Sequence, residues 1–274
     1  MRVMRGCEAL LPTDLLRALL VPLVIPSALR DLGLRSKLEN GWQYLKVEAP
    51  GQWSWFRECV RFHLVRFLNF WPDRLAEKSW RERVETQGLE AVMAVQAAGQ
   101  PTVLVCLHHG PVHLLRYLLR AAGLPCAMVV LESRAERSAV REWKDSLSPP
   151  AGVPNVFCRD ELKEMKHFMK EGGCLLVAAD YGRGKMVNTD FGPAKIEVAS
   201  GAFRLANSVG ATVFPVFVSE TGGWRFNVKA GAGKLAAGDM DELAAEVMDY
   251  LAARVMARPA AMHSQLADSL TAQK

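Results

Sequence analysis

The sequence contains no CxxC pair, and its six cysteines show none of the spacings by which cysteine and histidine hold zinc. Three of them, Cys106, Cys126 and Cys174, lie in or beside apolar runs that predict strands. We therefore expect free core thiols in a reducing compartment, which favours a cytoplasmic protein without a bound metal or cofactor.

The chain also lacks an uninterrupted apolar run that could cross a bilayer. Residues 10–29 are rich in leucine and valine, but Asp14, Arg17, Pro22 and Pro26 interrupt them. The charge-free part falls short of the roughly 20 apolar residues that a span requires, and no A-x-A-like cleavage site follows it. Two interpretations stay open: a packing helix, or a helix lying in the membrane interface. We expect at most peripheral contact with the inner face of the cell membrane.

The composition is that of an ordinary globular protein, with 50% hydrophobic and 23% charged residues among 274. The formal net charge of +5 is modest. It gives no argument for nucleic acid, but it suits work near anionic lipid or an acidic carrier protein. Repeats and low-complexity stretches are absent from the sequence, so we expect one domain over residues 1–274.

The distribution of hydrophobic residues divides this domain into a helical part, residues 1–95, and an α/β part, residues 96–274. Short apolar runs separated by helical patterns predict a largely parallel central sheet flanked by helices on both faces, with a helical N-terminal region. The predicted strands are 102–107, 126–131, 155–158, 174–179, 212–218 and 225–230. The predicted helices are 12–30, 31–46, 52–70, 73–98, 111–122, 135–146, 160–171, 198–209 and 239–257.

Three histidines gather directly after the first predicted strand of the α/β part. They lie in the stretch that runs from Leu107 through His108, His109 and Gly110 to His113, and the whole chain has six. This turn falls at the carboxyl edge of a parallel sheet, where open α/β proteins bind their ligands. One histidine at such a place is usually structural, but three predict a functional role for at least one.

Metal binding is the first alternative for this turn, because His109 and His113 are four residues apart and could share a helix face. A third ligand is not near in the sequence, and the glutamate of an HExxH pattern is missing. The His-His pair is also found in condensation-type acyltransferases, but those carry Asp-Gly where this chain has His113-Leu114. Neither alternative therefore accounts well for the three histidines of this turn.

An ordered set of segments around this turn resembles the lipid A biosynthesis acyltransferases of the lysophospholipid acyltransferase-like superfamily. The resemblance covers about residues 80–265 and rests on an H-x-G motif after an apolar strand, an acidic residue at a later strand end, and a closing histidine segment. The segments that carry it are 84–90, 99–110, 179–180, 191–193, 199–206, 212–216 and 258–263.

The resemblance implies that His108 is a general base, which takes a proton from an acceptor hydroxyl or amine so that the acceptor attacks an acyl thioester. The donor would be acyl carrier protein or acyl-CoA, and the acceptor a lipid or a small molecule. The family has an acid in H-x4-[E/D], where this chain has His113. A neutral imidazole there would bring no charge, so Asp180 and Glu132 are candidates to compensate. A non-catalytic acyl-binding or partner protein is the alternative.

The predicted catalytic residues are accordingly His108, His113 and Asp180. Predicted substrate-binding positions are those at the same sheet edge, in the loop after the second strand, in the glycine-rich loop after Asp180, and at the start of the following helix. They are His109, Gly110, Glu132, Arg137, Arg141, Arg183, Lys185 and Gly201.

Overall fold

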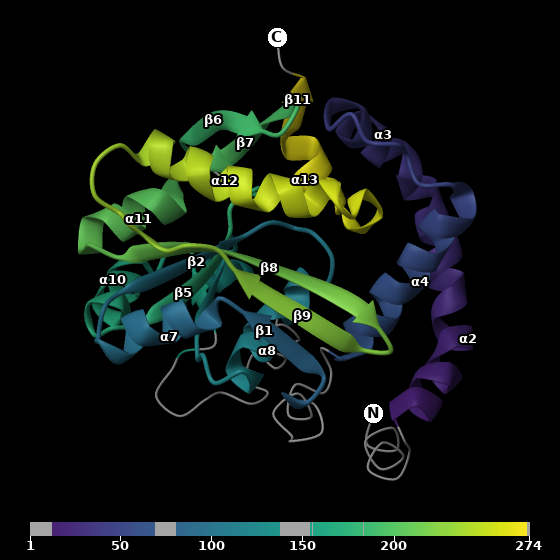
Figure 1. The fold of residues 1–274 in the computed structure, drawn as a ribbon, viewed down its shortest axis with the longest axis horizontal. Coiled ribbons are helices and arrows are strands. Elements are labelled where there is room, and N and C mark those ends of the chain that lie inside the picture. Colours follow the sequence, from purple (N-terminus) through teal and green to yellow (C-terminus); the bar gives the residue numbers. More distant parts are fainter. Residues whose placement is uncertain (1–12, 69–80, 138–153, 155, 183, 273–274) are drawn as a thin grey trace.

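The computed structural model describes residues 13–68, 81–137, 154, 156–182 and 184–272, and it confirms an α/β fold with a mostly parallel central sheet and an N-terminal helical region (Figure 1). The central sheet has the order β1-β9-β8-β2-β5-β3-β4, and β10 pairs with β8. Its strands are β1 (Val84–Gln87), β2 (Thr102–Cys106), β3 (Ala127–Val130), β4 (Val156–Cys158), β5 (Cys174–Ala178), β8 (Thr212–Gly222), β9 (Arg225–Ala230) and β10 (Lys234–Leu235).

Helices cover both faces of this sheet, and β2 shows why. All five of its residues are buried, and their side chains alternate between two cores. Leu104 and Cys106 pack with α7 and α8, whereas Val103 and Val105 pack with α10, α11 and α12. The bounds of these helices are α7 (Leu89–Ala97), α8 (Leu115–Ala121), α10 (Leu162–Lys170), α11 (Gly201–Val209) and α12 (Met240–Met256).

The predicted helix over residues 73–98 is wrong at its centre, because residues 84–87 form β1 and the helix α7 begins only at Leu89. The strand exists because β9 offers it a parallel partner from a distant part of the chain. Gly88 ends β1 with φ of +77°, and a Cβ there would lie 2.4 Å from the Ala230 carbonyl oxygen. The pairing is non-local, so the local pattern did not reveal it. Residues 73–80 lie outside the described residues.

A second, three-stranded sheet of order β11-β7-β6 was also not predicted. It comprises β6 (Met186–Phe191), β7 (Ala194–Ala199) and β11 (Leu270–Ala272). β6 alternates buried and exposed residues, and Gly192 makes the turn to β7 with φ of +60°. Because β7 occupies residues 198 and 199, the helix predicted from 198 begins at Gly201 instead.

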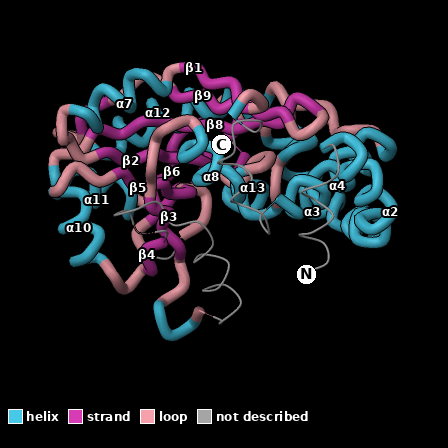
Figure 2. The backbone as a smooth tube through the Cα atoms, turned by 90° about the horizontal axis from the view of Figure 1, so that it is seen from below, coloured by secondary structure: helices cyan, strands magenta, loops and turns pink. Residues whose placement is uncertain are grey.

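The N-terminal helices α2 (Thr13–Asp31), α3 (Arg35–Tyr44) and α4 (Gln52–Phe67) lie together at one end of the molecule (Figures 1 and 2). α2 packs against α4 through one face, where Leu16, Leu20 and Val24 are buried. Asp31, at its end, accepts a hydrogen bond from Nε2 of His63 in α4 at 2.8 Å. Of the helices in the described part of the chain, none is long and apolar enough to cross a membrane.

Candidate active site

The site forms where β2 and β5 end side by side. These strands pair in parallel with Cys106 opposite Ala178, so the residues two positions further on, His108 and Asp180, face each other across the sheet edge. The ladder continues with a hydrogen bond from the Ala179 amide to the Cys106 carbonyl oxygen at 2.9 Å. Strand register alone therefore brings the first histidine of the turn to the acid that follows β5.

Asp180 holds His108 by both its backbone and its ring. The His108 amide lies 3.1 Å and 2.9 Å from the two carboxylate oxygens, and Nδ1 of the ring lies 3.0 Å from Oδ1. The Asp180 side chain is 0% exposed, whereas that of His108 is 24% exposed. An ionised carboxylate only accepts hydrogen bonds, so Nδ1 carries the proton and Nε2 keeps a lone pair. Chemically, a histidine held in this way can act as a base, with the buried carboxylate orienting its ring.

His113 is turned toward α4 instead of His108. The helix predicted from residue 111 begins with a 3-10 turn, Val112–Leu114, and α8 starts only at Leu115. This tighter winding carries the ring of His113 to Phe62, with centroids 5.7 Å apart. Among the described residues, no hydrogen bond joins it to His108. The partner of the His108 ring is thus Asp180, one of the two acids named above as able to compensate.

His109 and Gly110 join the turn to a distant segment near the C-terminus, residues 258–263. Nε2 of His109 donates to the Arg258 carbonyl oxygen at 2.9 Å, and the Gly110 amide donates to that of Ala261 at 2.7 Å. In return, the His263 amide donates to the His108 carbonyl oxygen at 3.1 Å. Gly110 has φ of +55°, a conformation that favours glycine. The ring of His109 is buried between the turn and this segment, and its hydrogen bond to Arg258 helps to hold the backbone around His108 in place.

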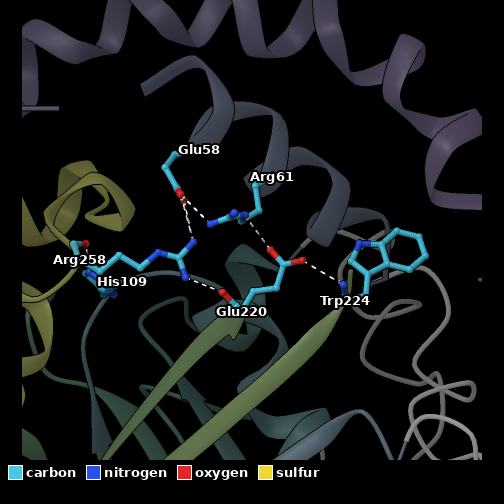
Figure 3. Close-up of polar contacts among 6 residues, drawn as sticks. All are labelled: Glu58, Arg61, His109, Glu220, Trp224 and Arg258. Carbon is cyan, nitrogen blue, oxygen red and sulfur yellow. Dashed lines mark hydrogen bonds and ion pairs between the residues drawn. The ribbon is translucent and has the colours of Figure 1, made fainter. Parts of the chain in front are cut away.

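The Arg258 side chain anchors that segment in a charged network (Figure 3). Nη2 lies 3.1 Å from both carboxylate oxygens of Glu58 in α4, and Nη1 donates to the Glu220 carbonyl oxygen in β8 at 2.6 Å. Arg61 contacts Glu58 at 2.7 Å and the Glu220 carboxylate at 3.3 Å. Burial raises the pKa of Glu58 and of Glu220, and the charge of Arg61 opposes the rise in both. Sequence reasoning missed this network because its members come from distant segments.

The remaining predicted positions spread along the same edge. Glu132 and Arg137 follow β3, which pairs with β5 on the side away from β2. The Ser200 amide and hydroxyl donate to the Lys185 carbonyl oxygen at 3.1 Å and 2.8 Å, which ties the loop after β5 to the start of α11. A Cβ at Gly201 would meet no atom within 4 Å, so space remains there. Arg141 and Arg183 lie outside the described residues.

A cavity of about 360 Å³ lies beside this turn, between α4 and the segment 258–263. His113 and His263 line it together with residues of the charged network. His263 had been noted only as part of the closing segment, yet its ring lies 6.4 Å from that of His108 and 5.0 Å from that of Phe62. Among the described residues, no cluster of three or more metal-ligating side chains is present.

Burial sets the protonation of the histidines around His108. It lowers the pKa of His109 to about 3 and, together with the charge of Arg66, that of His113 to about 3. It also lowers the pKa of His263 well below its ordinary value. All three rings are therefore neutral at pH 7. As the pH falls below about 6.5, these histidines become protonated in the unfolded chain but stay neutral in the folded protein. The free energy of unfolding therefore decreases toward acid pH.

We expect this loss to be measurable by urea unfolding at pH 7 and pH 5. Each such histidine contributes a slope of about 1.4 kcal/mol per pH unit between its folded and unfolded pKa. His113→Phe keeps an aromatic ring against Phe62 but cannot ionise. The pH dependence of its free energy of unfolding should therefore be shallower than that of the wild type by the contribution of one histidine. Comparing the two proteins cancels the opposite contributions of Glu58 and Glu220. An unchanged slope would show that His113 is protonated equally in both states.

Residues 60–264 match the family described as bacterial lipid A biosynthesis acyltransferase. The matched range contains all strands of the central sheet, the turn with His108, and Asp180. A comparison with curated proteins found no match.

Proposed function

Because the chain belongs to the bacterial lipid A biosynthesis acyltransferase family, we propose that this acyltransferase moves an acyl group from a carrier-protein or CoA thioester to a hydroxyl or amine. The acceptor would be a glycolipid, another lipid or a natural-product intermediate. His108 is the general base and Asp180 its orienting acid. The observation that carries this assignment is the 3.0 Å contact between Nδ1 of His108 and Oδ1 of a fully buried carboxylate.

The chemistry follows from the tautomer that Asp180 imposes. Nε2 of His108 takes the proton as the acceptor oxygen or nitrogen bonds to the thioester carbonyl carbon. The tetrahedral intermediate collapses with cleavage of the carbon–sulfur bond, and the imidazolium returns the proton to the leaving thiolate. The Asp180 carboxylate stabilises the imidazolium between these two steps. The proton that leaves the acceptor thus ends on the released thiol, and His108 returns to its neutral form.

Candidates for donor binding are the cations at this sheet edge. Arg137 follows β3 and Lys185 follows β5. Arg141 and Arg183, which lie outside the described residues, are further candidates on the basis of the sequence. CoA and the phosphopantetheine arm of a carrier protein both carry phosphate, for which arginine and lysine are the usual partners. Gly201, at the start of α11, leaves room for the donor to approach closely.

A thioester assay tests the proposal directly. Purified protein is mixed with lauroyl-acyl carrier protein or lauroyl-CoA and a total lipid extract, thiol release is followed, and the lipids are analysed by mass spectrometry. We expect lipid-dependent thiol release together with a new lauroyl ester or amide. Retention of intact thioester with both donors would favour the acyl-binding alternative. Mass spectrometry of copurified acyl ligands would then identify the chain that is bound.

We further propose that α2 lies on a membrane surface, where a lipid acceptor would be found. Its face opposite α4 is apolar: Leu15, Leu19 and Leu23, four residues apart, are 47%, 55% and 62% exposed. A helix with an uncovered apolar face can lie in the interface plane with that face in contact with lipid. This combines the two interpretations of residues 10–29, since one face packs and the other remains for lipid.

Leu19→Glu with Leu23→Glu should weaken sedimentation with vesicles of phosphatidylethanolamine and phosphatidylglycerol by at least about tenfold. Burying each leucine contributes about 1.5–3 kcal/mol, and the new charges oppose the anionic surface. The control is Leu162→Glu on α10, where the replaced leucine is 49% exposed. If the double variant binds vesicles like the wild type, α2 is not the contact. Protein that stays in membranes after carbonate washing would not be peripheral.

A further inference from the structure

Tyr181 is an exposed aromatic residue beside the base, and the proposed mechanism does not use it. It directly follows Asp180 in the sequence, but it is 54% exposed whereas Asp180 is 3% exposed. Its ring centroid lies 6.1 Å from that of His108, and the two rings are perpendicular. Aromatic side chains gain much from being covered, so a molecule that binds at His108 finds an apolar surface next to it.

The backbone around Tyr181 is fixed, so the exposure of its ring is built into the fold. On one side, the buried Asp180 carboxylate is held by the amide and the ring of His108. On the other side, Gly182 packs so closely that a Cβ there would lie 2.3 Å from the Cβ of Ala199. Both neighbours of Tyr181 are thus anchored, and its ring is presented next to the base.

The same loop carries a cation close to Tyr181. The Ala199 amide donates to the Ala179 carbonyl oxygen at 2.8 Å, and the Ser200 amide donates to the Lys185 carbonyl oxygen at 3.1 Å. Because Ala199 and Ser200 are consecutive, the two ends of the loop lie next to each other. Lys185 is exposed at the second end. An aromatic ring and an amine therefore belong to one short loop that is anchored at both ends.

The base has two sides, and Tyr181 lies on the side away from the cavity. Strand β2, which leads to the base, lies between β8 and β5 (Figure 1). The cavity borders the β8 side, where Glu220 of β8 and residues of α4 line it; in the described part of the chain its wall does not include Tyr181. Tyr181 follows β5 instead. Since α4 packs against α2, the helix proposed to lie on a membrane, a lipid acceptor arrives on the α4 side. The β5 side is then left for the acyl donor.

The chemistry of the donor fits this side. A pantetheine arm joins the thioester to a phosphate in both CoA and acyl carrier protein, and it consists of methylene groups, two methyl groups and two amides. The thioester carbon has to lie at His108, and Lys185 is a proposed partner of the phosphate. An arm between these two points passes the loop that carries Tyr181. A tyrosine offers an apolar ring to its methyl and methylene groups and a hydroxyl to its amides.

We propose that Tyr181 binds the pantetheine arm of the acyl donor, the part that CoA and acyl carrier protein share. The proposal rests on the proposed function, because it takes a thioester as the donor. It places the donor on the β5 side of His108 and the lipid acceptor on the α4 side. Tyr181 acts by contact with the arm, and the proton is still moved by His108. Loss of its ring therefore weakens donor binding and leaves the chemical step in place.

Proton NMR of the arm tests this contact without turnover. CoA and, separately, holo-acyl carrier protein are titrated with the protein, and the two methyl resonances of the pantetheine arm are followed. An aromatic ring in contact shifts these resonances through its ring current. We expect the shift with wild type and with Tyr181→Phe, and its loss with Tyr181→Ala. The matched control is Leu235→Ala, where the replaced leucine is 61% exposed on β10, and it should behave like the wild type.

The two probes also identify the carrier. A Tyr181-dependent shift with CoA alone, or with the carrier protein alone, supports the contact and shows which of them the protein binds. A shift that Tyr181→Ala retains, or the absence of a shift with both probes, would overturn the proposal. Melting curves confirm that each variant is folded.

Steady-state kinetics then separates binding from chemistry. In Tyr181→Ala the KM for lauroyl-CoA should rise about tenfold, the effect of uncovering roughly half of the exposed ring, while kcat changes by less than about threefold. Tyr181→Phe should stay within about threefold of the wild-type KM, because it keeps the ring. S-Lauroyl-N-acetylcysteamine lacks the arm beyond its first amide, so its KM should be the same in wild type and Tyr181→Ala. An equal rise for both thioesters would place the ring on the acyl chain and contradict the proposal.

The NMR experiment and the thioester assay fail separately. If the methyl shift depends on Tyr181 but no thioester is consumed, the contact with the arm stands and the proposed acyl transfer fails. If thioester is consumed while Tyr181→Ala keeps the wild-type shift and KM, the acyl transfer stands and this contact fails.

Discussion

Asp180→Asn should lower kcat for acyl transfer by about 10²–10⁴-fold while the protein stays folded. Asparagine has the same shape, and its carbonyl oxygen can still accept from the His108 amide. Its NH₂ group, however, cannot accept from Nδ1 of His108 and instead donates to it. The ring would then carry its proton on Nε2, the nitrogen that has to remove a proton from the acceptor. The imidazolium that forms during transfer would also lose its negative partner.

The measurement is kcat for thioester consumption in wild type, Asp180→Asn and the control Asp190→Asn. Asp190 is a β6 residue whose side chain is 74% exposed, and its substitution should leave kcat within about twofold. Melting curves establish that the loss in Asp180→Asn is not unfolding. A variant with wild-type kcat would show that the 3.0 Å contact does not orient the base. Glu132 would then be the acid to examine.

Arg258→Met should lower the free energy of unfolding by about 1.5–3 kcal/mol, the usual contribution of a hydrogen bond to a charged group, because the pair is partly buried. The Arg258 guanidinium contacts both oxygens of Glu58 and the Glu220 carbonyl oxygen. Methionine fills similar space but leaves the Glu58 carboxylate, with its pKa already raised by burial, to Arg61 alone. Arg258→Lys keeps the charge but cannot reproduce the planar fork, so its loss should be intermediate.

Urea unfolding measures this effect, and Arg159→Met is the matched control. Arg159 pairs with Glu136 at 3.1 Å, but both side chains are more than a third exposed, so its removal should cost under about 1 kcal/mol. Adding Glu58→Gln to Arg258→Met should lower stability by less than the sum of the single changes, because both remove the same contact. Additive losses would mean that the two side chains act separately.

The sequence predicted the place of the site better than its contacts. His108 and Asp180 follow apolar runs that are recognisable as strands, and parallel strand ends must meet at one sheet edge. The direction of the His113 side chain, by contrast, depended on the winding of residues 112–114, which form a 3-10 turn that no local pattern indicated. That single turn decides that His113 faces α4.

Other parts of the site depended on contacts between remote segments. Glu58 and Arg258 are 200 residues apart, and each alone looks like an ordinary surface charge in the sequence. β1 forms only because β9 lies next to it. By contrast, β6 carried a readable alternation of buried Val187, Thr189 and Phe191 with exposed Asn188 and Asp190, so that strand could have been predicted.

The central claim is that Nε2 of His108 removes the acceptor's proton. His108→Ala tests it most directly, measured as the rate of acyl transfer from lauroyl-acyl carrier protein alongside the exposed control His167→Ala. Both variants should melt like the wild type, because His108 contributes a partly exposed ring. The account predicts that transfer falls to the background rate in His108→Ala and is unchanged in His167→Ala. Transfer at the wild-type rate by a folded His108→Ala protein would contradict it.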